Sequence, residues 1–284
     1  MVVVDAIVHG AVSLVNAIAI GKGATLGIDT FVKTRLKTED GSGVSITTDN
    51  KKISSRLINK VITNIVPKRQ LEKTKLELDF KSNIPTGYGL KSSSAISTAV
   101  AMVCSKAFKR NLSDGKILKI GAKSSIQAKV SITGAYDDAC GCYYGGFNVT
   151  DNYKKNLIFR HPAPRNLQAI IFLPKSRKRG NLKKLKDFKP AFEKAWELAK
   201  NSDYWNAATL NGIATSSILN SNPELILNLI KKCAITATIS GNGPSIVAIT
   251  KKGHNSHIKK VFSSLEGSVM ISNINNKKAE VYEV

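Results

Sequence analysis

The clearest alternation of apolar and polar positions in this chain runs over residues 76–80. Leu76, Leu78 and Phe80 alternate with charged residues, which is the period of a half-buried β-strand. The run from Ala95 to Cys104 is small and apolar and contains no glycine or proline, which predicts a buried helix. The loop between them is rich in glycine and serine, so this segment is predicted as strand, glycine-rich loop and helix.

The rest of the chain alternates between strand-like and helix-like patterns. Helical spacing of apolar residues predicts helices over 54–66, 113–130, 188–200, 204–220, 222–232 and 255–265. Strands are predicted within 2–20 and over 24–34, 44–48, 147–150, 157–159, 167–173, 234–239, 246–250, 268–271 and 279–282. These elements predict an α+β fold. The proline-rich stretch 161–164 predicts a boundary between a domain of residues 1–163 and a domain of residues 164–284.

Charge and cysteine usage narrow the class of protein. Lysine and arginine exceed aspartate and glutamate by 23 over 284 residues. Such a surface attracts nucleotides, phosphorylated metabolites, acidic substrates or nucleic acid. The four cysteines form no C-x-x-C pair, which favours a reduced, cytoplasmic protein. The apolar N-terminal stretch contains Asp5, His9 and Asn16 and lacks a basic start, so neither a signal peptide nor a membrane span is expected.

The loop before the predicted helix has the features of an anion site. Gly87 and Gly89 allow positive φ and a close approach of the backbone to a ligand. The first turn of the helix offers unpaired N–H groups, and the three serines at 92–94 add hydroxyls. The loop is not a Walker A motif, because Leu90 separates Gly89 from Lys91. A phosphate loop is favoured over the alternative, in which a serine simply caps a core helix.

Two further segments carry candidate chemistry. Asp137 and Asp138 lie side by side among small and aromatic residues, where carboxylates are rarely placed without a partner. Asp137 is the candidate for accepting the proton of an acceptor hydroxyl or directing it, although either acid could instead cap a short helix. The loop 240–245, Ser-Gly-Asn-Gly-Pro-Ser, could approach a ligand, but its Asn-Gly pair on its own favours a hairpin turn.

Together these three loops resemble the motifs of the GHMP small-molecule kinases, a superfamily that includes galactokinase, homoserine kinase and mevalonate kinase. The central motif P-x-x-x-G-L-x-S-S-S/A-A is matched over 85–95, the acidic motif by Asp137, Asp138 and the glycine pair 145–146, and the motif G-x-G-P-S over 241–245. Within the superfamily the chain is most similar to the archaeal shikimate kinases, through residues 16–29, 89–95 and 133–140. The resemblance favours a ligand-binding role for the 240–245 loop over a simple hairpin turn.

The resemblance implies a fold of two domains, a ribosomal-protein-like N-terminal α/β layer and a ferredoxin-like C-terminal α+β layer. It also implies specific site residues. Asp137 would be the catalytic base or orienting group, and Ser93 the ligand of Mg²⁺. The nucleotide-binding residues would be Pro85, Gly87, Gly89, Leu90, Lys91, Ser92, Ser93, Ser94 and Ala95. The substrate-binding residues would be Asn16, Lys22, Asp29, Thr133, Gly134, Asp137, Gly241 and Gly243.

Two departures from the superfamily pattern stand out. Ala11 occupies the position where mevalonate kinases have a lysine, which argues against mevalonate as the acceptor. Gln127 lies where many members have a glutamate ligand of Mg²⁺, so the metal would rest on Ser93, phosphates and water. Lys22 and Arg177 are candidates for binding a substrate carboxylate.

The function implied by the resemblance is phosphorylation of the shikimate 3-hydroxyl by ATP with Mg²⁺, in chorismate and aromatic amino acid biosynthesis. Homoserine and mevalonate are the alternative acceptors. The expected partners are small molecules, without nucleic acid or membrane, and the chain is expected to be a monomer or homodimer. A basic nucleic-acid-binding protein is a further alternative, disfavoured because the strands lack interleaved aromatic and basic residues.

Overall fold

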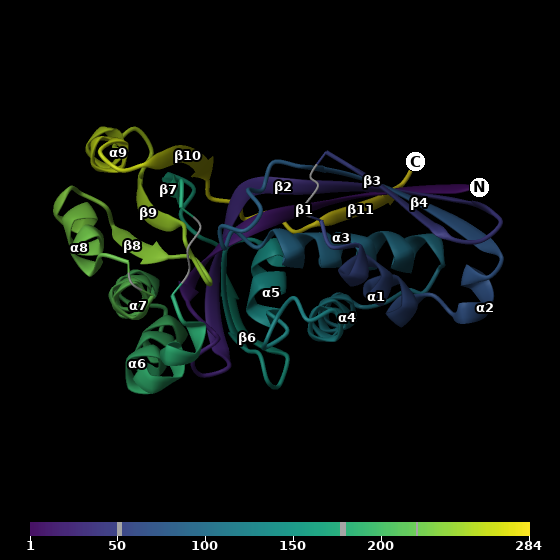
Figure 1. Cartoon of the computed structure of the whole chain (residues 1–284), viewed down its shortest axis with the longest axis horizontal. Helices are drawn as coiled ribbons and strands as arrows, with labels where there is room; N and C mark the ends of the chain where they lie inside the picture. The colour runs from purple at the N-terminus through teal and green to yellow at the C-terminus, as the bar shows by residue number, and fades with distance from the viewer. Residues whose placement is uncertain (50–52, 177–179, 220) are drawn as a thin grey trace.

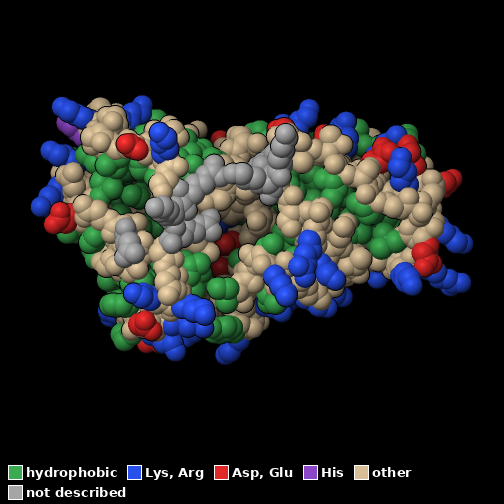
Figure 2. Space-filling view, in the orientation of Figure 1, with side chains coloured by type: hydrophobic (Ala, Val, Ile, Leu, Met, Phe, Trp, Pro, Cys, Tyr) green, Lys and Arg blue, Asp and Glu red, His purple; other side chains and the backbone are tan. Residues whose placement is uncertain are grey.

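Two β-sheets with helices packed against them make up the protein (Figure 1). A computed structural model describes residues 1–49, 53–176, 180–219 and 221–284. Basic side chains are distributed over both halves of the face seen in Figure 2. In the described part of the chain, no helix has the length and apolar character needed to cross a membrane.

The first sheet is built around the long strand β2. Its strands are β1 (Val2–Val15), β2 (Lys22–Asp40), β3 (Val44–Thr48), β4 (Thr74–Ser82), β5 (Phe147–Asp151), β6 (Asn156–His161) and β11 (Glu280–Glu283). Their order is β11-β1-β2-β4-β3, and β5 pairs with both β2 and β6. The start of β2 pairs with β5 and its end pairs with β4, so one strand joins two parts of the sheet.

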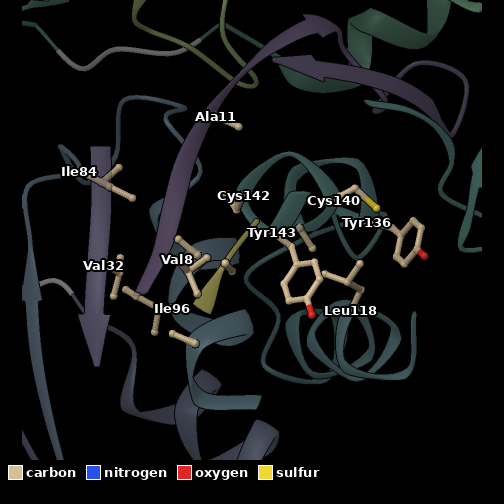
Figure 3. Close-up of a cluster of buried hydrophobic side chains, with 14 of the residues drawn as sticks. Val8, Ala11, Val32, Ile84, Ile96, Leu118, Tyr136, Cys140, Cys142 and Tyr143 are labelled. Atoms are coloured by element: carbon tan, nitrogen blue, oxygen red, sulfur yellow. The ribbon is translucent and has the colours of Figure 1, made fainter. Parts of the chain in front are cut away.

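Helix α3 is the centre of the first half. The helices there are α1 (Ser55–Ile65), α2 (Lys68–Leu71), α3 (Ser92–Ala107), α4 (Asp114–Gln127) and α5 (Tyr136–Tyr144). Every residue of α3 is buried except Ser93, Lys106 and Ala107, as the run of small apolar residues predicts. Figure 3 shows Val8 of β1 and Val32 of β2 on the side of the sheet that faces Ile96 of α3.

The second sheet shares its core with the first. It has the order β10-β7-β9-β8, from β7 (Leu167–Pro174), β8 (Thr236–Ile239), β9 (Ile246–Lys251) and β10 (Gly267–Asn273). Its helices are η1 (Leu182–Phe188), α6 (Lys189–Lys200), α7 (Tyr204–Ile218), α8 (Pro223–Lys231) and α9 (Ser256–Ser263). Along β7, Ile170 and Phe172 pack with residues of α8 and α9. The alternate residues Ala169 and Ile171 belong to the cluster that extends into the first half.

The α+β prediction is confirmed, and the predicted helices and strands match the observed ones to within a few residues at most ends. The predicted strand 24–34 is the middle of the longer strand β2. The chain passes from the first sheet to the second between β6 and β7, near the predicted boundary, and returns to the first sheet with β11. Arg177 lies outside the described residues, so its predicted role stays a prediction.

Candidate active site

A cavity of about 580 Å³ opens between the two halves. It is lined by the glycine-rich loop and the start of α3, the end of α4, the start of α5, the end of β1 and the loop between β8 and β9. Figure 2 shows this hollow near the middle of the molecule, with acidic side-chain atoms on its floor. The acidic residues in the lining are Asp137 and Asp138.

The glycine-rich loop presents the start of α3 to the cavity. Gly87 and Gly89 have φ values of 87° and 79°, the left-handed conformation that glycine adopts most readily. The N-cap is Lys91, also left-handed at φ 68°, and no side chain caps the helix. The alternative hypothesis of a serine cap is therefore wrong. Ser93 is the exposed serine of the three, so its hydroxyl and the first-turn N–H groups are available to an anion.

Asp137 lies in the first turn of α5 and is 3% exposed. The N-cap of this helix is Ala135, so the alternative in which an aspartate takes the N-cap position is also wrong. The side-chain amide of Asn152 donates to Asp137 Oδ1 at 2.6 Å. The other carboxylate oxygen lies over Gly23, where a Cβ would come within 2.4 Å of Oδ2. The carboxylate therefore lies between the side-chain amide of Asn152, which donates a hydrogen bond to it, and the backbone of β2 at Gly23, where no side chain intervenes.

The surroundings of Asp137 raise its pKa. Burial disfavours the charged form, and the neighbouring Asp138 adds to this, which together raise the pKa of Asp137 from 3.8 to about 7. Lys91 and the hydrogen bond from Asn152 act in the opposite direction. A carboxyl group with a pKa near neutrality can both accept a proton and release it again, which suits general base chemistry.

Lys91 connects three segments at the bottom of the cavity. Its side chain is 3% exposed, and its ammonium lies 2.8 Å from Asp138 Oδ1. It also donates to Ser13 Oγ at 2.6 Å, and that oxygen accepts the N–H of Gly241 at 3.0 Å. The ammonium of Lys91, a residue predicted to bind the nucleotide, thus has two protein partners, one from α5 and one from β1.

The loop 240–245 is a hairpin connection that also lines the cavity through Gly241 and Asn242, while its predicted ligand-binding role stays a prediction. It joins the paired strands β8 and β9, as a hairpin connection does. It also reaches the glycine-rich loop, because Ser240 Oγ donates to the carbonyl of Gly89 at 2.8 Å. Asn16 donates to the carbonyl of Gly241 at 2.8 Å. The loop is therefore a hairpin that fixes the second half of the chain against the cavity.

Most of the predicted site residues meet in this cavity, although they come from both halves of the chain. Those in its lining are Asn16, Pro85, Gly87, Gly89, Leu90, Lys91, Ser92, Ser93, Ser94, Thr133, Asp137 and Gly241. The lining does not include Lys22, Asp29, Ala95, Gly134 or Gly243.

Physical reasons account for the clearest of these exceptions. Asp29 is exposed on β2, beyond the stretch that carries Gly23. The ammonium of Lys22 lies 4.6 Å from the centre of the Trp196 ring, a cation–π contact. Ala95 is fully buried and faces the core. Gln127 accepts from Asn64 at 2.7 Å and is not in the lining either.

The sequence interpretation missed three residues that the structure places at the site, and it did not predict the contact made by a fourth, Asp138 of the acidic motif. Ser13 and Asn152 are buried and contact Lys91 and Asp137, while Asp138 pairs with Lys91. Lys129 is exposed and lines the cavity rim. Serine and asparagine are common in loops, so neither Ser13 nor Asn152 carried a signal of its own. The pair Asp137-Asp138 did carry one, because carboxylates among small and aromatic residues are rarely placed without a partner.

Comparison with known proteins decides the family. Residues 56–146 match the family model of the GHMP kinases N terminal domain. The chain is 34% identical over 283 residues to a shikimate kinase of Methanosarcina acetivorans, which covers 95% of this chain and 93% of the relative. The chain belongs to the GHMP kinases. A second GHMP kinase relative, a shikimate kinase of Methanothermobacter thermautotrophicus, is 30% identical over 96% of each chain.

The solved structures of GHMP kinases confirm the predicted two-domain fold. The homoserine kinase from Cytophaga hutchinsonii superposes with a TM-score of 0.76 over 99% of this chain and 97% of that chain. Its identity is 19%, so it shows the fold alone. As a GHMP kinase, this chain is a small-molecule kinase, and the cavity between its two halves is the candidate active site.

Proposed function

We propose that this GHMP kinase transfers the γ-phosphoryl group of ATP to the 3-hydroxyl of shikimate, a step of chorismate and aromatic amino acid biosynthesis. The observation that carries the proposal is the placement of a buried carboxylate, Asp137, in the same cavity as the open start of α3. The choice of shikimate as the acceptor rests on the archaeal relatives named shikimate kinase, which are similar to this chain over nearly its whole length.

The groups at the start of α3 fit a nucleotide and Mg²⁺. The first-turn N–H groups and the positive end of the helix dipole suit the phosphates. The exposed hydroxyl of Ser93 is a hard oxygen ligand of the kind that Mg²⁺ accepts. Among the described residues no group of three or more His, Cys, Asp or Glu gathers, and Mg²⁺ in kinases commonly rests on phosphates and water. Bound there, Mg²⁺ would neutralise phosphate charge.

The proposed step needs little covalent chemistry from the protein. The acceptor oxygen bonds to the γ-phosphorus, the bond from that phosphorus to the β–γ bridging oxygen breaks, and ADP leaves. The acceptor proton passes to the carboxylate of Asp137. The start of α3 binds the phosphates, and Asp137 orients the hydroxyl, so positioning and charge complementarity provide the rate enhancement. Exposed Lys129 at the rim offers a cation to the anionic substrate.

An acceptor panel tests the substrate. ADP release is measured with shikimate, homoserine and mevalonate at equal concentrations. We expect kcat/KM for shikimate to exceed the others by about 10² or more, because a site built to bind particular hydroxyls rejects molecules that lack them. A higher kcat/KM with homoserine or mevalonate would replace shikimate as the acceptor. RNA binding that weakens steeply with salt would instead favour a nucleic-acid partner.

The pH dependence of the reaction tests Asp137 as the base. Because the pKa of Asp137 is raised to about 7, the carboxyl is mostly protonated below that pH and ionised above it. We therefore expect kcat/KM to rise about tenfold for each pH step of one below neutrality and to level off above it. Initial rates between pH 5.5 and about pH 8.5 measure this. A flat profile across neutrality would contradict the assignment.

A further inference from the structure

Asn152 makes a two-point contact with Asp137. It directly follows β5, is 1% exposed, and meets Asp137 at the start of α5. Its side-chain amide nitrogen lies 2.6 Å from Asp137 Oδ1, and its side-chain oxygen accepts the backbone N–H of Asp137 at 3.0 Å. One carboxamide thus binds both the main chain and the side chain of the same residue.

The orientation of this carboxamide follows from the contacts. A backbone N–H can only donate, so the Asn152 atom that faces it must be the oxygen. The hydroxyl of Thr150 donates to that oxygen at 2.9 Å as well. The NH₂ group must therefore point at the Asp137 carboxyl, where it can donate but cannot accept. Such a donor favours the ionised form of the carboxyl group.

The contact is anchored in the sheet. The backbone N–H of Asn152 donates to the carbonyl of Gly21 at 2.8 Å, next to the start of β2. Thr150 belongs to β5, which pairs with the same end of β2. Gly23 of β2 lies beneath the second carboxylate oxygen. Because Asn152 is hydrogen-bonded to Gly21 and Thr150 as well as to Asp137, the position of the paired strands β2 and β5 determines where the Asp137 carboxylate lies.

We propose that Asn152 is a positioning residue for phosphoryl transfer, which fixes the rotation of the Asp137 carboxylate and so the orientation that this carboxylate presents to the acceptor hydroxyl in the cavity. The inference rests on the proposed function. Asp137 is the base in this arrangement, and Asn152 is the group that orients it. Nucleophile, base and orienting group are combined in the same way in other enzymes. Asn152 differs from Asp137 in that it takes no proton, and its effect passes through the geometry and charge state of Asp137.

Two substitutions separate positioning from general support of the fold. Asn152→Asp keeps the shape and the acceptor oxygen but replaces the NH₂ donor with an oxygen that faces Asp137. Asn152→Ala removes both contacts. The matched control is Asn148→Ala, in which a fully buried asparagine of β5, the strand that Asn152 follows, loses its hydrogen bonds to the carbonyls of Gly145 and Gly146.

We expect both Asn152 variants to lower kcat by about 10- to 100-fold while KM for ATP changes by less than about threefold, because the nucleotide contacts are untouched. We also expect the midpoint of the pH profile to move to higher pH, since the ionised carboxyl loses a donor. The charged neighbours of Asp137 that contribute to its pKa, Lys91 and Asp138, are unchanged in both variants, and so is the thiol of Cys140 on the next turn of α5.

The outcomes are distinguishable. Asn148→Ala should lower stability in a thermal melt while its kcat stays within about threefold of wild type and its pH midpoint stays in place. If Asn152→Asp retains the wild-type kcat and midpoint, or if the Asn152 variants lose only what Asn148→Ala loses, Asn152 is structural and the inference fails. If Asp137→Asn itself keeps full activity, the proposed function of Asp137 fails instead. Because Asn152→Asp preserves shape, it gives an answer even where the alanine variant does not fold.

Discussion

Asp137→Asn is expected to lower kcat by about 10² or more, the scale of general base contributions, and at the same time to stabilise the fold at neutral pH. Asparagine keeps the shape and can still accept the hydrogen bond from Asn152, but it takes no proton from the acceptor. ADP release at saturating substrates measures the first effect. An unchanged kcat would remove Asp137 from the chemistry.

The sign of the stability effect follows from the raised pKa of Asp137. The carboxyl ionises at about 3.8 in the unfolded chain but at about 7 in the fold, so the unfolded state binds fewer protons between these values. Stability contributed by the wild-type residue therefore falls as pH rises through this window and stays low above it. We expect the asparagine variant to gain roughly 2 to 4 kcal/mol at pH 8 and almost nothing near pH 4. Urea unfolding at both pH values measures the difference.

Asp114→Asn provides the matched contrast. Burial raises the pKa of Asp114, but hydrogen bonds from Lys278 and Tyr143 outweigh it and leave the pKa below its usual value. The same substitution there should lower stability at neutral pH and matter less in acid, the opposite sign. If Asp137→Asn lowers stability at neutral pH, as Asp114→Asn is expected to do, the pKa of Asp137 is not raised in the folded protein.

Lys91→Met is expected to destabilise the protein by roughly 2 to 4 kcal/mol and to reduce activity strongly. The change leaves the Asp138 carboxylate, 20% exposed, without the ammonium that lies 2.8 Å away. It also removes the donor to Ser13, which joins β1 to the β8–β9 loop. Urea unfolding and kcat measure the two effects.

An exposed pair of the same type is the control. Lys278 contacts Asp114 at 2.7 Å, with side chains 50% and 39% exposed, so Lys278→Met should cost less than about 1 kcal/mol. The double variant Lys91→Met/Asp138→Asn removes both charges and should recover most of the lost stability. Equal losses for Lys91→Met and Lys278→Met would mean that the buried pair does not hold the site together.

Individual strands and helices could be predicted because each depends on the pattern of apolar and polar residues within its own segment. The alternation at residues 76–80 is β4, and the small apolar run after the glycine-rich loop is α3. The backbone of the loop could also be predicted, since Gly87 and Gly89 adopt the positive φ expected of them, while nucleotide binding there stays a prediction.

The connections within the site could not be predicted from the sequence in the same way. Lys91 and Ser13 are 78 positions apart, and Ser13 and Ser240 are 227 apart, so no pattern in a short window links them. The resemblance implies that Lys91 binds the nucleotide, but no sequence pattern indicates that its ammonium also pairs with Asp138 and Ser13. The backbone at Lys91 is left-handed, and its side chain contacts Asp138 of α5. No sequence pattern singles out Asn152, because a lone asparagine after a strand usually marks a turn.

Strand β11 has a consequence for how the protein is made. It pairs with β1 at the opposite end of the chain, and Ala279 just before it donates to the carbonyl of Tyr143. During translation β1 emerges long before β11 is synthesised, so one edge of β1 stays unpaired until β11 follows. An unpaired sheet edge can pair with strands of other chains, and contacts between residues far apart in the sequence form slowly. A gene fragment that encodes only the first half would therefore yield an unfinished, aggregation-prone polypeptide rather than an independent module.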